Sequence, residues 1–157
     1  MKPTEILLLN LEEVRRKSLK VWRGIPPQHL HWKPDAEAMT CIELVRHVPE
    51  CEYLYLYMLK NGDRFPYDQS PWAASPYASI EAEIEFAEPY HKELLDLVGS
   101  YTQEELSATK ILWSNKGYAR TIADFILRAA YHESVHTGQI LSYLRMLDVH
   151  ARTFGIE

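Results

Sequence analysis

Two histidines near the end of the chain, His132 and His136, have the spacing of metal ligands on a helix. The surrounding segment, 122–147, carries apolar residues at helical intervals, so we expect it to be a helix. Both histidines fall on its apolar stripe, so we expect them on the face that packs inward. Residues four apart on a helix project from one face, about 6 Å apart along its axis. Two imidazoles placed in this way can bind one divalent cation while a third ligand arrives from another element. The spacing therefore predicts a metal site on this helix.

The candidate for the third ligand is His47, on the apolar stripe of another expected helix. That stripe consists of Leu44, His47, Cys51, Leu54 and Met58. A single histidine on such a stripe is usually a hydrogen-bonded core residue, but burying three imidazoles is unfavourable unless each has a partner. One metal ion would be that partner, so we predict that it is bound by His47, His132 and His136. Cys51, one turn after His47, is interpreted as a small buried residue, with metal contact as the alternative.

Glu133 follows His132 directly, about 100° around the helix, so it does not share the ligand face. It is a solvated carboxylate, a hydrogen-bonding support for a neighbouring histidine, or the general base for a metal-bound water. We retain it as the candidate catalytic residue. His-Glu-x-x-His is also the zincin protease signature. That class is disfavoured because Ser142 stands where a metzincin has its later histidine, and only Glu157 remains for a thermolysin-like glutamate.

Periodicity and capping residues predict four long helices. The first spans about 4–23, and the others run to about 61, 98 and 148 after their N-caps, which are Thr40, Ser79 and Thr121. Pro89 is expected to interrupt or split the third helix. A capping box at Thr102 predicts a short extra helix, and 111–120 is expected to be a loop or a short extended stretch. With a proline-rich connection over 63–78, the pattern predicts an all-α four-helix bundle with a long crossover after helix two.

Length, charge and cysteine content narrow the functional classes. The chain has 157 residues, a length that predicts one domain over 1–157. Its net charge is −5 and it has no Lys/Arg cluster, so we expect no nucleic-acid partner. We expect no membrane partner, because no basic amphipathic stretch and no apolar run of about 20 residues is found. No signal-peptide pattern is recognised, so we expect a cytoplasmic protein. Cys41 and Cys51 are expected on one helix, about 15 Å apart, and therefore as free thiols.

The ordered set of motifs resembles the DinB-like (YfiT-like) superfamily, whose members are regarded as metalloenzymes. The segment 30–34, Leu-His-Trp-Lys-Pro, resembles the connection after the first helix of the family. The segment 43–47 resembles the start of its second helix, which carries the first metal histidine, and Glu52 lies where members often have a glutamate. The segment 132–140 is similar to the signature of its last helix. Pro49 and the proline-rich crossover depart from the family pattern.

The resemblance implies homodimers and a site that binds zinc or nickel through His47, His132 and His136. For some members it also implies transferase or isomerase activity with low-molecular-weight thiols. Our first hypothesis is therefore an enzyme, a thiol-dependent S-transferase or a hydrolase, in which the metal activates a thiol or water against a small-molecule substrate. The second is a non-catalytic, stress-associated metal-binding protein whose metal is structural or sensory. We expect substrate to enter beside the aromatic crossover, where the candidate walls are Tyr67, Trp72 and Trp113.

Overall fold

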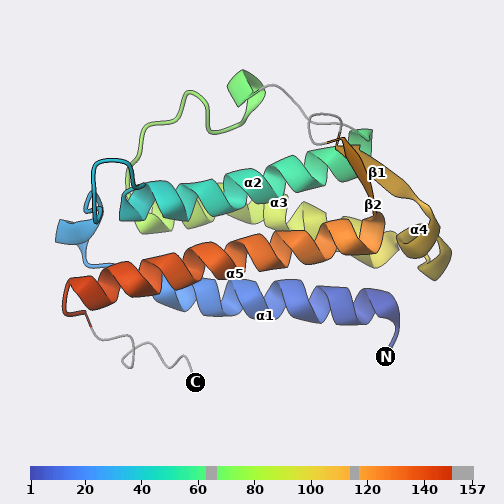
Figure 1. Ribbon diagram of the computed structural model, residues 1–157, viewed down its shortest axis with the longest axis horizontal. Coiled ribbons are helices and arrows are strands. Elements are labelled where there is room, and N and C mark those ends of the chain that lie inside the picture. The colour runs from blue at the N-terminus through green and yellow to red at the C-terminus, as the bar shows by residue number, and fades with distance from the viewer. Residues whose placement is uncertain (63–66, 114–116, 150–157) are drawn as a thin grey trace.

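The computed structural model of the chain describes residues 1–62, 67–113 and 117–149. Four long helices form a bundle (Figure 1), namely α1 (Pro3–Arg23), α2 (Cys41–Asn61), α3 (Ile80–Ser100) and α5 (Ile122–Met146). The shorter elements are the 3-10 turns η1 (Pro27–His29) and η2 (Tyr67–Gln69), helix α4 (Gln103–Ala108), and strands β1 (Lys110–Trp113) and β2 (Tyr118–Thr121). Among the described residues, no helix combines the length and apolar character needed to cross a bilayer. The predicted bundle with a short extra helix is confirmed.

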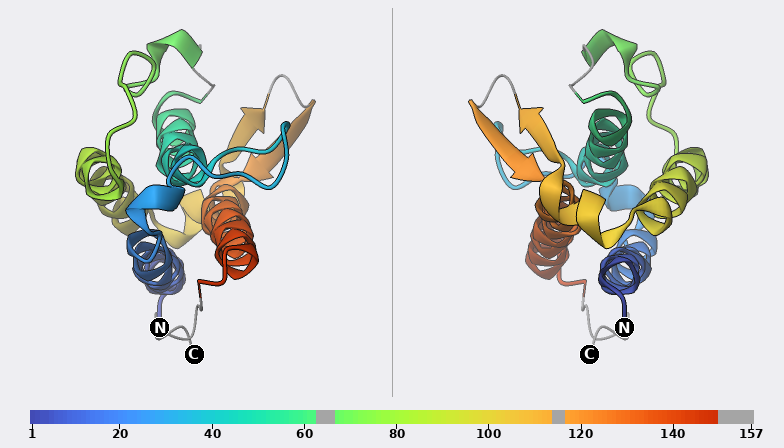
Figure 2. Two further views of the ribbon diagram at one scale, coloured as in Figure 1. Left: turned by 90° about the vertical axis from the view of Figure 1, so that its left-hand side faces the viewer. Right: turned by 90° about the vertical axis from the view of Figure 1, so that its right-hand side faces the viewer.

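The order of the helices around the bundle differs from their order along the chain. Helices α1 and α2 each pack against both α3 and α5, so α1 and α2 occupy opposite corners of the bundle, as the end-on views show (Figure 2). Helices α2 and α3 run in one direction and α1 and α5 in the other (Figure 1). Because α2 and α3 are parallel neighbours, the segment that connects them must run back along the bundle from the end of α2 to the start of α3. The described part of that connection, 67–79, does so, which confirms the predicted crossover.

The region 111–120, expected to be a loop or a short extended stretch, consists largely of strands β1 and β2. They pair antiparallel, with a register from Lys110 opposite Thr121 to Trp113 opposite Tyr118. Ile111 is buried and Leu112 is exposed, the alternation expected of a strand with one covered face. Thr121 ends the hairpin and also caps α5, so the hairpin leads directly into the helix with the two histidines.

All four predicted N-caps are present. Each accepts a hydrogen bond on its side-chain oxygen from the backbone N–H three residues later, and the four are Thr40, Ser79, Thr102 and Thr121. At Thr40 the capping box is complete, because Oγ1 accepts from the Glu43 N–H at 3.3 Å and Glu43 Oε2 accepts from the Thr40 N–H at 2.7 Å. The start of α2, and with it the axial position of His47, is therefore fixed by local sequence.

Replacing Thr40 with alanine is expected to lower the free energy of unfolding by about 1 kcal/mol, because one helix-terminal N–H loses its acceptor. Urea denaturation followed by far-UV circular dichroism measures this change. Thr109→Ala, which alters an exposed threonine outside the helix starts, is the control and should change the stability by less than about 0.5 kcal/mol. Equal losses in the two variants would contradict the assigned cap.

The prediction that Pro89 interrupts or splits the third helix is wrong. Helix α3 is continuous from Ile80 to Ser100. Proline removes one backbone donor and leaves the carbonyl four residues earlier, that of Glu85, without its helical partner. Pro89 and Glu85 both lie on the exposed side of α3, where water can bond to that carbonyl, so the helix tolerates the proline.

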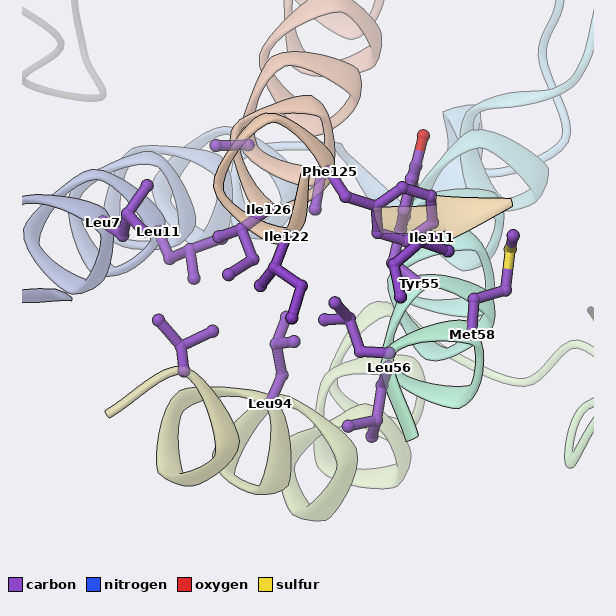
Figure 3. Close-up of a cluster of buried hydrophobic side chains, with 14 of the residues drawn as sticks. Leu7, Leu11, Tyr55, Leu56, Met58, Leu94, Ile111, Ile122, Phe125 and Ile126 are labelled. Atoms are coloured by element: carbon purple, nitrogen blue, oxygen red, sulfur yellow. The ribbon is translucent and has the colours of Figure 1, made fainter. Parts of the chain in front are cut away.

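The core consists of two apolar clusters separated by a polar layer. The first cluster, shown in Figure 3, is centred on Leu11, Leu56, Leu94 and Phe125. The second includes Trp22, Val45, Ile84 and Ile140. Between them each long helix contributes one buried ionisable side chain, and these are Arg15, Glu52, His91 and Glu133. The predicted metal ligands lie beside this layer, because His132 directly precedes Glu133 on α5.

Candidate metal centre

The three predicted histidines meet on the seam between α2 and α5. The Nε2 atom of His132 lies 3.2 Å from Nε2 of His47 and 3.0 Å from Nε2 of His136. The ring centroids of His47 and His136 are 4.7 Å apart, so the three rings are mutual neighbours. The structure thus brings together every residue that the sequence named as a ligand. Their binding of a metal remains a prediction.

The histidines lie at the edge of the core, not on its most buried stripe as the sequence suggested. On α5 the buried polar positions are Glu133 and Thr137, whereas His132 and His136 are half-buried. The face of α5 that points into the bundle carries Glu133 where the sequence predicted His132, because Arg15 binds Glu133 inside the bundle. Half-burial at a helix seam leaves the imidazoles reachable from solvent, which a metal that exchanges ligands requires.

Hydrogen bonding among the imidazoles alone cannot pair all three Nε2 atoms at once. A neutral imidazole nitrogen offers either one proton or one lone pair. The Nε2 atom of His132 therefore makes one conventional hydrogen bond, although two Nε2 atoms lie within bonding distance of it. A divalent cation would accept a lone pair from all three. Metal–nitrogen distances of about 2.0–2.1 Å in a tetrahedral site place the nitrogens about 3.3 Å apart, close to the observed separations, so these residues fit a metal.

The protonation of the rings also suits a metal. Burial, reinforced by the neighbouring histidines and Arg128, lowers the pKa of His132 to about 4. Burial and then His136 lower the pKa of His47, so both rings are neutral at pH 7. The Nδ1–H of His136 donates to Gln139 Oε1 at 2.5 Å, because an amide oxygen can only accept. This contact leaves the lone pair of His136 on Nε2, the nitrogen that faces His132.

Cys51 adds a sulfur atom to the same group. Its Sγ lies 3.7 Å from both ring nitrogens of His47, and Sγ and the donor nitrogens of His47 and His132 all lie within 4.8 Å of one another. Burial, with a smaller contribution from Glu50, raises the pKa of the Cys51 thiol to about 12. Cys41 and Cys51 are both free, as the sequence predicted.

Glu133 points into the polar layer. Arg15 Nε and Nη2 donate to its two carboxylate oxygens at 2.9 and 3.0 Å, and Nη2 also donates to Glu52 at 3.1 Å. Glu52 in turn accepts from His91 Nδ1 at 3.0 Å. With 4% of its surface exposed, Glu133 is not a solvated carboxylate. Because both of its oxygens are bound to Arg15, the geometry favours a supporting role for Glu133 over that of a general base.

A cleft of about 380 Å³ opens beside His47. It is bounded by the segment before α2, by the outer face of α2 and by Tyr77 at the end of the crossover; its charged lining residues are Lys33, Glu37, Glu43, Arg46 and Glu50. Arg46 fixes one wall, because it donates to the carbonyls of Ser75 and Pro76 and stacks on the Tyr77 ring at 3.9 Å. The cleft is thus polar, is lined by His47, and has one wall held in place by Arg46.

The comparison with known families decides where the chain belongs. A sequence profile of the DinB superfamily matches residues 10–140. The chain belongs to the DinB superfamily. The matched range includes His47, His132 and His136, the three residues that meet on the α2/α5 seam.

Two Bacillus subtilis proteins are similar to this DinB-superfamily chain. The uncharacterized protein YjoA (strain 168) is 26% identical over 126 residues, which are 77% of this chain and 75% of YjoA. The crystal structure of YjoA, a DinB-like protein, has a TM-score of 0.71 at 20% identity, over 90% of this chain and 92% of that one. YfiT, described as a probable metal-dependent hydrolase with an unusual four-helix bundle topology, has a TM-score of 0.77 at 13% identity, over 94% and 89%. These likenesses confirm the fold.

Arg15 and His91 are not predicted as site residues from the sequence of this DinB-superfamily chain. For Arg15 a signal was available, because Leu7, Leu11, Arg15, Ser18 and Trp22 follow helical spacing and are all buried. A charged residue in the middle of such a stripe indicates a buried ionic partner on another helix. His91 offers no comparable signal, because its partner Glu52 is 39 residues earlier in the chain.

Of the three aromatic residues expected as walls of the substrate entrance, only Trp72 has a described side chain. The side chains of Tyr67 and Trp113 lie outside the described part of the structure. Trp72 is 3% exposed and packs against Phe86 and Tyr90 from α3, with ring centroids 5.0 and 5.4 Å away. It anchors the crossover to the bundle and is not among the residues that line the cleft beside His47.

Proposed function

We propose that this DinB-superfamily protein binds one divalent metal ion through His47, His132 and His136 and acts as a metal-dependent enzyme on a small-molecule substrate. We further propose zinc or nickel as the metal, and hydrolysis or transfer to a low-molecular-weight thiol as the reaction. The observation that carries the proposal is the convergence of three Nε2 atoms, with those of His47 and His136 at 3.2 and 3.0 Å from that of His132. The description of YfiT as a probable metal-dependent hydrolase supports this class of reaction.

The three imidazoles have a defined task in this proposal. They are neutral ligands and leave at least one coordination position for water, a thiol or substrate. When bound, the metal would supply a Lewis acid that lowers the pKa of a water or thiol at that position. Gln139 orients the ring of His136. Arg15 holds Glu133, the residue after His132, so we assign Glu133 to positioning α5 and not to proton transfer.

The cleft beside His47 indicates the kind of substrate. Both positive and negative side chains line it, and Arg46 and Tyr77 shape the wall at the end of the crossover. Its volume of about 380 Å³ lies in the range of small-molecule sites, about 300–1,000 Å³. A small polar molecule with groups of both charges would match this lining, whereas a large apolar one would displace water from the charged groups.

Elemental analysis of protein purified without an affinity tag tests the metal site, and one zinc or nickel per chain is expected. The metal-loaded protein is then assayed with small esters and alkylating electrophiles, with and without added cysteine or glutathione. Turnover that requires the thiol identifies a transferase, and turnover that ignores it identifies a hydrolase. Protein that neither carries nor takes up a stoichiometric metal would contradict the proposal.

The second candidate is a non-catalytic protein in which the metal is structural or sensory. The proximity of Cys51 to His47 favours it, because a fourth protein donor that is never displaced would close the coordination shell as in structural zinc sites. This candidate requires that chelation lowers the melting temperature while no electrophile is turned over under any of the conditions above.

A further inference from the structure

We propose that Cys51 is a fourth protein ligand of the metal, so that the resting site has three imidazoles and one thiolate. This inference rests on the proposed function, because it needs the metal that the three histidines bind. Coordination by Cys51 would change the charge of the metal centre and determine how an external thiol or water reaches the metal.

Three separations, which link Cys51 to His47, His47 to His132 and His132 to His136, match edges of a coordination tetrahedron. A metal–sulfur distance of about 2.3 Å and metal–nitrogen distances of about 2.0–2.1 Å give nitrogen–sulfur edges of about 3.6 Å and nitrogen–nitrogen edges of about 3.3 Å. The Sγ of Cys51 lies 3.7 Å from His47 Nε2, and the two nitrogen–nitrogen contacts are 3.2 and 3.0 Å. The sulfur thus lies within one coordination edge of His47, and with His47 and His132 it forms a group of donors that one metal ion can join.

The helix geometry explains why Cys51 takes this position. Residues 47 and 51 are four apart on α2, as 132 and 136 are on α5, so each helix presents a pair of donors to the seam. Sulfur is equally distant from both ring nitrogens of His47, so it lies beside the ring and is not directed at one lone pair. A thiol–imidazole hydrogen bond alone does not account for this placement.

Coordination by Cys51 converts its thiol to a thiolate and releases one proton. A bond forms between Sγ and the metal, the S–H bond breaks, and its proton passes to solvent. The centre then carries one positive charge instead of two, and the thiolate favours soft or borderline ions such as zinc. An external thiol or water must displace the thiolate, or expand the coordination shell, to reach the metal. Cys51 would therefore act as an internal ligand that competes with the external one.

Cobalt(II) substitution tests the assignment without an activity assay. Visible d–d bands report a tetrahedral site, and a sulfur-to-cobalt charge-transfer band in the near ultraviolet reports thiolate ligation. We expect both signals in the wild-type protein. In Cys51→Ala the charge-transfer band should disappear while the d–d bands remain, and the affinity for Zn²⁺ should fall at least about tenfold.

The control is Cys41→Ala, which removes the chain's other cysteine, a buried residue outside the group of donors. It should keep both signals. Adding glutathione to cobalt-loaded Cys51→Ala should restore a charge-transfer band, because the external sulfur then occupies the vacant position. Wild-type protein with d–d bands but no charge-transfer band would overturn the assignment of Cys51 and leave the three-histidine site standing. Failure of the wild-type protein to bind cobalt(II) in equilibrium dialysis would overturn the proposed function as well.

Discussion

The change His132→Ala is expected to lower the affinity for Zn²⁺ by more than about 100-fold, a larger effect than the loss of a supporting residue. His132 is the central member of the group, because its Nε2 lies next to Nε2 of both His47 and His136. Its removal leaves only two imidazole ligands, one on each helix. Competition titration against a chelating indicator measures the affinity.

Thermal unfolding gives an independent measure of the same change. Zinc at 100 times its dissociation constant stabilises the folded wild-type chain by about 2.7 kcal/mol, which corresponds to a rise of about 5–10 °C in melting temperature. In His132→Ala the melting temperature should not respond to zinc at that concentration. His31→Ala, which removes an exposed histidine, should bind zinc as the wild type does. Equal affinity in the two variants would show that the metal binds elsewhere.

The sequence predicted the histidine group because local rules govern it. The interval between His132 and His136 requires only a helix, and the capping box at Thr40 sets the start of the helix that carries His47. Whether His47 comes to the other two depends on which helices are neighbours. The apolar stripes limit which helices can be neighbours. Helices α2 and α5 each have an apolar face beside the histidines, and each of these faces must pack against another helix.

The polar layer and the burial of individual residues could not be predicted in the same way. The spacing rule placed His132 on the most buried face, but the long-range contact with Arg15 draws Glu133 there instead. That contact joins residues 118 positions apart, and no local pattern specifies it. The short extended stretch was expected as an alternative to a loop, but its pairing into a hairpin was not, for a related reason. Strands of four residues are too short for an alternating pattern to stand out.

A second large effect is expected from Arg15→Met, which should lower the free energy of unfolding by about 3–5 kcal/mol. Glu133 would lose the donor to both of its oxygens, and Glu52 would keep only His91. Burial by itself raises the pKa of Glu52, and it is Arg15, with His91, that holds that pKa below its usual value. Without the guanidinium, Glu133 is a buried carboxylate that has lost its cationic partner, and Glu52 depends on His91 alone. Urea denaturation at pH 7 measures the loss.

The neighbouring arginine provides the matched control. Arg16 is exposed and pairs with Glu13 at 2.7 Å, so Arg16→Met should change the stability by less than about 1 kcal/mol. The double variant Arg15→Met with Glu133→Gln should recover at least about 1 kcal/mol relative to Arg15→Met, because the amide removes one unpaired charge. If Arg15→Met were no more destabilising than Arg16→Met, the layer would have no structural role.

Metal affinity shows whether the layer also positions the site. Glu133 and Glu52 directly follow His132 and Cys51, so loss of their common partner should shift these neighbours and lower zinc affinity about tenfold. Leu94→Ala removes a buried side chain from the first apolar cluster and should be destabilising by about 2–5 kcal/mol, yet it should leave the affinity unchanged. Both variants are compared at a temperature where each is folded. If the two bind zinc equally well, Arg15 stabilises the bundle without positioning the metal ligands.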